Sequence, residues 1–367
     1  MHTRLLKVLL VIPDLQEGGA ERLIEVTAPY YIKHNMELII CVFNKKRRIG
    51  RDIEELYGVN VISLNEKVTL SNISILFKLI RVIKKARPDV IHCHMYPANF
   101  YGRIANIFST KRKKIVITEH NKYINKKWYH IKTDELFSIV TDKVICVSEC
   151  VMKFTMQQEK LINRSKFLVL YNAVQEVESI KYNISYREKY KLSKYYVVVM
   201  VSRLVSQKRH IDLLEAAKYI NKKIKVVIAG DGPLMDKLKS HAKKHSINNC
   251  IFLGHVPDIP VLLSESDAFA FPSEREGHPL SLVEAMRSGL PIVASDIDCN
   301  TEILTDGINS KIYHLYNIHE LAEQINWVFS NKMMAKKLGL KAKEASKTFS
   351  CYNHVSELRC VYDSLLK

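Results

Sequence analysis

Short apolar runs alternate with amphipathic stretches along most of the chain. In the first half, apolar runs predict strands at residues 7–12, 38–43, 59–63, 90–94, 115–118, 143–147 and 167–170. Between some of them, apolar positions repeat every three to four residues and predict helices at residues 20–34, 73–86 and 99–108. This alternation is typical of a doubly wound α/β domain with a parallel sheet.

A second series of the same kind follows a polar, tyrosine-rich stretch at residues 175–195, which we interpret as a linker. Strands are predicted at residues 196–201, 225–229, 250–253, 268–271 and 291–294, and helices at residues 211–220, 234–244, 261–264 and 280–287. We therefore expect two Rossmann-like doubly wound domains, at residues 1–178 and 179–348, that face each other across a cleft. An amphipathic helix at residues 349–367 is expected to pack back on the first domain.

The charge of the chain narrows the classes of partner. The 367 residues carry a formal net charge of +18, which favours nucleic acid, anionic lipid or a phosphorylated substrate. Basic clusters lie in the first half, at Lys45, Lys46, Arg47, Arg48 and Arg51, at Lys78, Arg81, Lys84, Lys85 and Arg87, and at Lys111, Arg112, Lys113 and Lys114. Nucleic acid is the weakest of these partners, because no zinc-finger, RRM or KH signature occurs and the cations are not interleaved with aromatic residues. A solvated basic face without a specific partner stays open.

The N-terminal residues indicate in which cellular compartment the protein is expected. Lys7 interrupts the first apolar run, so we interpret it as a buried strand and not as a signal peptide. A membrane-spanning helix is not expected, because the chain has no run of about 18 uncharged apolar residues. We expect a cytoplasmic protein whose basic clusters bring it to the inner face of the plasma membrane as a peripheral protein.

The segment from Ser273 to Met286, SEREGHPLSLVEAM, is the most informative for function. It follows the predicted strand at residues 268–271 and enters the predicted helix at residues 280–287. Free backbone amides at the start of a helix attract an anion, and Gly277 allows the backbone to approach a ligand closely. Pro279 suits the first helical turn, and Gly289 suits the end of the helix. The segment therefore predicts a phosphate-binding turn.

Two carboxylates accompany this turn. Glu276 lies before the predicted helix and Glu284 lies on it, so both can line one side of the same cleft. A carboxylate accepts two hydrogen bonds at once, which suits paired sugar hydroxyls. Taken alone, the two residues could equally be a surface loop residue and a solvated helix residue, and only the flanking motifs favour a site.

Further signals follow the first strand of each predicted domain. Arg203 and Lys208 follow the strand at residues 196–201, where two cations can clamp a diphosphate and stabilise its departure. Gly18 and Gly19 follow the first strand of the chain and permit a tight turn against phosphate or sugar. The turn GDGP at residues 230–233 is interpreted as mainly structural. His92 and His94 point to one side of a predicted strand, where we expect packing and not metal binding.

Together these motifs resemble the retaining family-4 glycosyltransferases of the GT-B fold. The shared patterns are GGAER at residues 18–22, the Arg203 and Lys208 pair, and Glu276-x₇-Glu284 followed by AMRSGLPIVA at residues 285–294. AGDGPL at residues 229–234 and FLGHV at residues 252–256 are also similar. The resemblance covers nearly the whole chain and is far more specific in the second half.

The resemblance implies a role for each matching position. The donor diphosphate would be held by Arg203, Lys208, Leu280, Ser281, Gly18 and Gly19. Glu284 would bind the donor ribose, and the transferred sugar would lie against Glu276, Gly277 and His278. Glu276 and His120 would be the catalytic residues, His120 from the motif TEHN at a strand end. The family usually has an aromatic residue where this chain has His278.

The expected reaction is transfer of a sugar from a nucleoside diphosphate to a glycan or polyprenyl-linked acceptor, with retention of the anomeric configuration. Leaving-group stabilisation and positioning are evident but no nucleophile is, so we expect front-side transfer without a metal or other cofactor. The resemblance implies a role in bacterial surface polysaccharide biosynthesis, such as capsule or lipopolysaccharide. A GT-B sugar-nucleotide epimerase or phosphorylase is the alternative, and a nucleic-acid-binding protein is a remote one.

Overall fold

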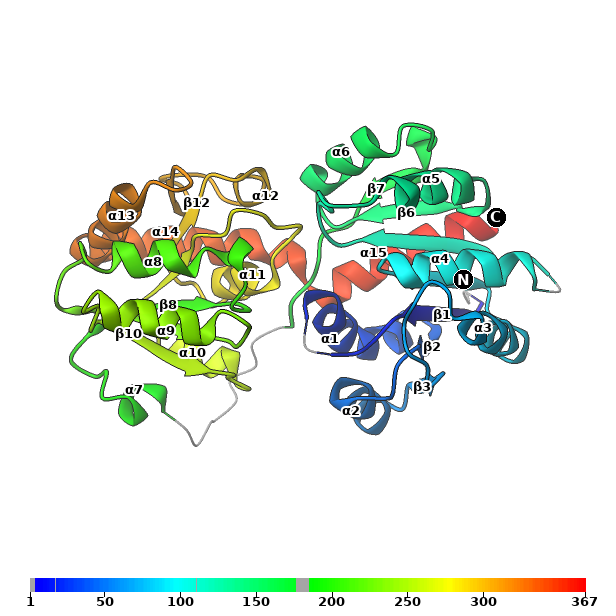
Figure 1. Ribbon diagram of the computed structural model, residues 1–367, viewed down its shortest axis with the longest axis horizontal. Coiled ribbons are helices and arrows are strands. Elements are labelled where there is room, and N and C mark those ends of the chain that lie inside the picture. Colours follow the sequence, from blue (N-terminus) through cyan, green and yellow to red (C-terminus); the bar gives the residue numbers. More distant parts are fainter. Residues whose placement is uncertain (1–3, 17, 110, 176–184) are drawn as a thin grey trace. The chain divides into compact units, whose positions relative to one another are not determined.

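The computed structural model describes residues 4–16, 18–109, 111–175 and 185–367. The chain divides into two compact units, Met1–Gln175 with Phe349–Lys367 (unit 1) and Glu176–Thr348 (unit 2). Each unit is an α/β domain built on a parallel sheet (Figure 1). The expected fold class, two Rossmann-like domains, is confirmed.

Unit 1 contains a seven-stranded sheet with the order β3-β2-β1-β4-β5-β6-β7. Its strands are β1 (Leu6–Ile12), β2 (Met36–Val42), β3 (Asn60–Ser63), β4 (Val90–His94), β5 (Lys114–Glu119), β6 (Lys143–Cys146) and β7 (Phe167–Val169). Neighbouring strands are parallel. The central strands are nearly continuous apolar runs because helices cover both faces of the sheet.

Helices on one face of this sheet lie side by side in the order α3 (Ile73–Ala86), α4 (Tyr96–Ile107) and α5 (Trp128–Phe137), with α5 followed by the 3₁₀ turn η1 (Ser138–Val140). Figure 1 shows α4 in front of the strands and α15 (Cys351–Leu366) behind them. The remaining helices of the unit are α1 (Gly19–Lys33), α2 (Arg48–Tyr57) and α6 (Glu149–Gln158), and a 3₁₀ turn, η2 (Arg164–Lys166), precedes β7.

The C-terminal helix α15 belongs to the core of unit 1. Val355, Leu358 and Tyr362 of α15 are buried in one cluster with Tyr31 of α1 and residues of β1 and β2. An isolated parallel β-bridge joins Val174, which follows β7, to Ser350, which precedes α15. The end of the chain therefore completes the first domain after the chain has built the second.

Unit 2 contains a six-stranded sheet with the order β10-β9-β8-β11-β12-β13. Its strands are β8 (Tyr196–Val201), β9 (Ile224–Ala229), β10 (Cys250–Gly254), β11 (Ala268–Phe271), β12 (Ile292–Ser295) and β13 (Lys311–Tyr313). Its helices are α7 (Tyr186–Lys189), α8 (His210–Ala216), α9 (Met235–Lys244), α10 (Ile259–Ser264), α11 (Leu280–Arg287), α12 (Asp298–Thr301), α13 (Ile318–Ser330) and α14 (Lys332–Ala345), with 3₁₀ turns η3 (Ser206–Lys208) and η4 (Ser346–Phe349).

Several elements were not predicted, and α5 shows why. Its buried residues are acidic, Asp134 and Glu135, whereas Trp128 and Leu136 are exposed. This arrangement inverts the pattern from which amphipathic helices are recognised. The other elements outside the prediction are α2, α6, α7, α12, α13, α14 and β13, and α7 lies within the stretch interpreted as a linker. The rest of that stretch, residues 176–184, lies outside the described residues.

Candidate active site

The strand order of unit 2 reverses between β8 and β11, which pair directly in parallel. The carboxyl ends of parallel strands lie at the same edge of the sheet, so the segments that follow β8 and β11 meet at this edge. In open α/β sheets this reversal is where ligands bind. The segment after β8 contains Arg203 and Lys208, and the segment after β11 contains Glu276.

Lys208 and Glu276 are brought together. The Lys208 Nζ lies 2.5 Å from the Glu276 Oε1, and their side chains are 15% and 7% exposed. Lys208 also lies over the ring of Phe271, the last residue of β11, at 5.6 Å from the ring centroid. The backbone N–H of Glu274 donates to the carbonyl of Gln207 at 2.9 Å, which ties the two segments together. Arg203 lies exposed at the end of β8.

Helix α11 begins at Leu280 and ends at Arg287, as predicted. Pro279 is its N-cap and not part of the first helical turn, which corrects the prediction by one residue. Among the described residues, no side chain caps the N-terminus, so the amides of Leu280 and Ser281 are placed to donate to an anion. Gly277 and His278 are buried just before the helix, and Glu284 is partly exposed on its second turn.

The end of α11 explains why its boundary could be predicted. Gly289 has φ 75°, a left-handed conformation that favours glycine. Its N–H donates to the Met286 carbonyl at 2.9 Å, and the Leu290 N–H donates to the Ala285 carbonyl at 3.3 Å. These two bonds form a Schellman motif, which satisfies carbonyls that the helix leaves without a partner.

The turn at residues 230–233 supports the segment that holds Arg203. Gly230 has φ 133°, and a Cβ built there would lie 2.0 Å from the Ser202 carbonyl oxygen. A Cβ on Gly232 would lie 2.5 Å from the Leu204 carbonyl oxygen. Leu204 in turn donates its N–H to the Asp231 carbonyl at 2.9 Å. The glycines let two backbone segments touch, and this sets the position of Arg203 between Ser202 and Leu204.

We predict that Gly230→Ala displaces the Arg203 segment and weakens donor binding at least tenfold, because the methyl group and the Ser202 carbonyl cannot share the same space. Gly307→Ala is the matched control: Gly307 also has positive φ (68°), but no atom of the described residues lies within 4 Å of its Cβ position. Isothermal titration with the nucleotide donor measures both variants. Equal binding by the two variants would contradict the prediction.

In unit 1 the strand order reverses between β1 and β4, so the equivalent edge lies after these strands. Gly18 is the N-cap of α1, in an extended conformation. Among the described residues, no atom lies within 4 Å of a Cβ built on Gly19, whereas the atoms nearest to one built on Gly18 belong to the flexible Glu21 side chain. The described part of the chain therefore leaves space beside Gly19.

His120 follows β5 and contacts His94, the last residue of β4. The His120 Nε2 lies 2.9 Å from the His94 Nδ1, and the two rings stack with their centroids 5.1 Å apart. Sequence reasoning assigned His94 to packing and missed this contact. The contact follows from the pairing of β4 with β5, which aligns His94 with Thr118, two residues before His120.

The contacts continue inward from His94. His92 lies beneath it, with ring centroids 4.3 Å apart. The His92 Nδ1 lies 2.6 Å from the Tyr362 hydroxyl of α15, and its Nε2 lies 2.7 Å from the Thr118 hydroxyl. Burial lowers the pKa of His92 to about 3 and that of His120 to about 4. Both imidazoles are therefore neutral at pH 7 and can exchange hydrogen bonds without carrying charge.

Two family models match the chain. One described as Glycosyltransferase Family 4 matches residues 17–176, and one described as Glycosyl transferases group 1 matches residues 183–345. The chain belongs to the family-4-like glycosyltransferases of the GT-B fold. The predicted family and the predicted glycosyltransferase class are confirmed.

Curated relatives of this glycosyltransferase are similar over most of their length. An uncharacterized glycosyltransferase of Methanocaldococcus jannaschii is 28% identical over 291 residues, which cover 77% of this chain and 78% of the relative. The Escherichia coli UDP-Gal:alpha-D-GlcNAc-diphosphoundecaprenol alpha-1,3-galactosyltransferase is 28% identical over 293 residues, 71% of each chain. A capsular polysaccharide biosynthesis glycosyltransferase of Staphylococcus aureus, CapH, is 25% identical over 317 residues, 82% of this chain and 84% of the relative.

Solved structures share the fold. A glycosyltransferase from Rickettsia africae has a TM-score of 0.85 at 22% identity and covers 99% of both chains. Anabaena HepE, solved in complex with UDP, has a TM-score of 0.84 at 20% identity, with 98% of this chain and 100% of that chain covered. Within the described residues of the glycosyltransferase, no group of His, Cys, Asp and Glu side chains is arranged to hold a metal ion, and no helix could cross a membrane.

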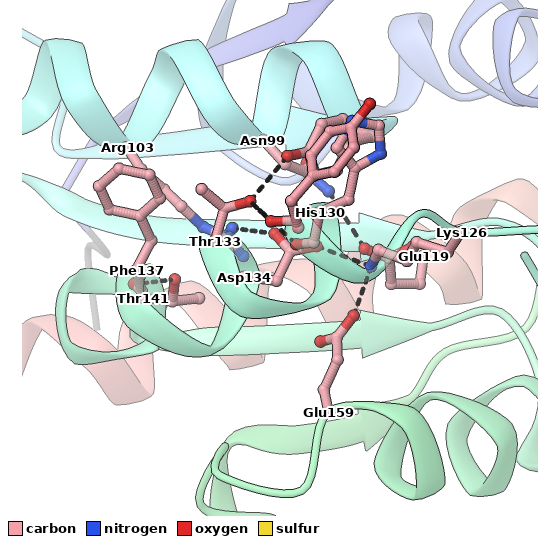
Figure 2. Close-up of polar contacts among 12 residues, drawn as sticks. Asn99, Arg103, Glu119, Lys126, His130, Thr133, Asp134, Phe137, Thr141 and Glu159 are labelled. Atoms are coloured by element: carbon pink, nitrogen blue, oxygen red, sulfur yellow. Dashed lines mark hydrogen bonds and ion pairs between the residues drawn. The ribbon is translucent and has the colours of Figure 1, made fainter.

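The glycosyltransferase contains a buried cluster of charged side chains around Glu119, the residue that precedes His120 in the chain (Figure 2). Lys126 pairs with Asp134 at 2.7 Å and with Glu159, and Asp134 also pairs with Arg103 of α4. Asn99 of α4 donates to Glu119 at 3.2 Å, and Glu119 directly precedes His120. The cluster therefore connects β5, α4, α5 and the end of α6 beneath the strand end that presents His120.

The acids of this cluster outnumber its cations, and the pKa values of two of the acids are raised. Burial raises the pKa of Glu159 to about 8, against the opposing charge of Lys126. Burial also raises the pKa of Glu119, again opposed by Lys126. At pH 7 one carboxyl of the group is thus held protonated, which leaves the remaining buried charges close to balance.

We predict that Lys126→Met lowers the free energy of unfolding by about 3 kcal/mol, because Asp134 loses a buried counter-charge and Glu159 loses a buried hydrogen-bond donor. The neighbouring Lys127 is exposed, so Lys127→Met is the matched control and should change stability by less than about 0.5 kcal/mol. Urea denaturation followed by circular dichroism compares the two. Equal stabilities would mean that the cluster does not depend on Lys126.

Proposed function

We propose that the protein transfers a sugar from a nucleoside-diphosphate donor to a glycan or polyprenyl-linked acceptor, with retention of the anomeric configuration. The observation that carries this proposal is the pairing of Lys208 with Glu276 at the strand reversal of unit 2, next to the uncapped start of α11. UDP is the nucleotide that we expect, which the complex of Anabaena HepE with UDP supports.

Each residue of this edge has a role in the proposal. Lys208, Arg203 and the amides of Leu280 and Ser281 would hold the diphosphate and stabilise its negative charge as it departs. Lys208 would exchange part of its contact with Glu276 for the phosphate oxygens. Because α11 fixes Glu284 on its second turn, that carboxylate would accept hydrogen bonds from the ribose hydroxyls.

The transferred sugar would lie against Glu276, Gly277 and His278. Glu276 is only 5% exposed, so a sugar hydroxyl that reached its carboxylate would be shielded from water. His120 would contact the sugar from unit 1 as a neutral hydrogen-bonding group, since burial lowers its pKa to about 4. Gly18 and Gly19 would approach the diphosphate through their backbone amides.

Transfer in this proposal is front-sided and needs no metal. The acceptor oxygen attacks the anomeric carbon on the face from which the diphosphate leaves, and a departing phosphate oxygen takes the acceptor proton. The fixed positive charges of Arg203 and Lys208 then replace the metal ion that other glycosyltransferases use to stabilise a diphosphate.

The acceptor side rests on relatives and charge. The E. coli relative is named for a diphosphoundecaprenol-linked acceptor and CapH for capsular polysaccharide biosynthesis. We infer a role in bacterial surface polysaccharide biosynthesis at the cytoplasmic membrane face. The basic clusters of unit 1 would favour peripheral contact with anionic lipid.

A panel of sugar nucleotides tests the donor proposal by thermal shift, and one donor should raise Tm by several degrees.

Glu276→Ala should lower kcat/KM for that donor at least a hundredfold, since a contact to the reacting sugar is lost. Glu323→Ala, on the exposed face of α13, is the matched control. No shift with any nucleotide would overturn the proposal, and full activity of Glu276→Ala would remove Glu276 from it.

The anomeric configuration of the product tests retention directly. With an α-linked sugar nucleotide as donor, we expect an α-glycosidic product, which the one-bond coupling of the anomeric carbon reports in NMR. A β-linked product would contradict front-side transfer while leaving the donor site intact.

A further inference from the structure

The outer surface of one helix layer in unit 1 differs from an ordinary solvated surface. Helices α3, α4 and α5 lie side by side on the sheet. Tyr96 of α4 stacks on His130 of α5 at 4.0 Å, and the Tyr101 hydroxyl of α4 donates to the Thr69 carbonyl before α3 at 2.6 Å. We call the outward side of α3, α4, α5 and η1 the α3–α5 surface.

Apolar side chains line each element of the α3–α5 surface. On α3, Ile73 and Phe77 are one turn apart and 64% and 59% exposed. On α5, Trp128 and Leu136 are two turns apart and 75% and 64% exposed. Helix α4 and its end contribute four more apolar side chains. They are the partly exposed Phe100 and Ile104 and the exposed Ile107 and Phe108, and Ile139 of η1 extends the row beyond α5.

Cations surround these apolar side chains, and acids are turned away from them. Helices α3 and α4 contain no acidic residue. The acids of α5, Asp134 and Glu135, are 1% and 7% exposed. Glu135 pairs with Lys132 of the same helix, and Asp134 pairs inward with Arg103 and Lys126. The α3–α5 surface therefore shows no exposed carboxylate from its helices.

The exposed cations lie around the ends of the helices. Arg81, Lys84 and Lys85 are exposed on the last two turns of α3, and Lys127 is exposed at the start of α5. Arg112, beyond the end of α4, donates to the Ile139 carbonyl at 3.3 Å, which brings that basic cluster beside η1. The basic clusters found in the sequence at residues 78–87 and 111–114 thus border the same apolar side chains.

We propose that the α3–α5 surface docks on an anionic lipid bilayer, with Phe77, Trp128 and Leu136 entering the headgroup region. The proposal rests on the proposed function, because it names the surface by which the enzyme would meet a membrane-bound acceptor. Apolar side chains interspersed with cations fit the interface of an anionic membrane. The apolar side chains would contact the acyl chains, and the cations would contact the lipid phosphates. A nucleic acid would not accommodate the exposed aliphatic side chains.

Trp128 gives a direct readout of this docking. The chain has two tryptophans, and the second, Trp327, lies in unit 2 under Lys311. In a Trp327→Phe background, the fluorescence of Trp128 should shift to the blue and resist iodide quenching when vesicles of equal phosphatidylglycerol and phosphatidylcholine are added at low salt. Pure phosphatidylcholine vesicles should produce no such change. Vesicle binding without a change at Trp128 would overturn the assignment of the surface.

Paired variants separate the apolar and charged contributions. The double variant Phe77→Ser with Leu136→Ser should weaken vesicle binding at least tenfold. The double variant Arg81→Gln with Lys84→Gln should weaken vesicle binding at least tenfold at low salt. At high salt it should have little effect, because salt already screens the cations. The matched controls are Ile308→Ser with Met333→Ser, 60% and 77% exposed, and Lys237→Gln with Lys239→Gln, exposed on α9. Controls that weaken binding as much would overturn the proposal.

Two further outcomes are distinguishable. The donor-induced thermal shift should be the same in wild type and in the surface variants, so loss of vesicle binding with an intact donor shift isolates the membrane surface from the proposed catalysis. Absence of vesicle binding by the wild type would overturn the proposal and leave the donor site standing. If light scattering shows a lipid-free dimer that Phe77→Ser with Leu136→Ser dissociates, the surface binds a second copy and the membrane assignment is wrong.

Discussion

The direct parallel pairing of β8 with β11 is the constraint on which the candidate active site depends. These strands are separated in the chain by two strands on the far side of β8, so their pairing creates the reversal in strand order. The segments that follow them must then leave the sheet at one edge. Lys208 and Glu276 meet because each lies a few residues beyond its strand, and the 2.5 Å contact between them is a consequence of topology.

Backbone contacts help to hold this edge in place. Gly230 and Gly232 let one turn press against the Ser202–Leu204 backbone, and Glu274 is tied to Gln207. A site that must bind a flexible, highly charged diphosphate benefits from this arrangement, since cations on a rigid backbone need little reorganisation when charge develops. Lys208 is thereby oriented by its neighbours before any ligand is present.

Much of this could be predicted from the sequence, and the exceptions have physical causes. The bounds of α11 follow from Pro279 and Gly289, whose backbone preferences do not depend on the fold. The contact between His94 and His120 could not be predicted, because it requires knowing that β4 and β5 are neighbours. Helix α5 was missed because its acids, Asp134 and Glu135, are buried while Trp128 and Leu136 are exposed.

That inversion connects the interior of unit 1 with its outer surface. Arg103 and Lys126 are buried, and a buried cation needs a buried counter-charge. Asp134 supplies it from α5, and Glu135 of the same helix holds Lys132. Each acid committed in this way is withdrawn from the outside, so the cations at the helix ends meet no exposed carboxylate on these helices. Helices α3 and α4 contain no acids, so the burial of Asp134 and Glu135 on α5 both supplies the buried cluster with a carboxylate and leaves these three helices without an exposed acid.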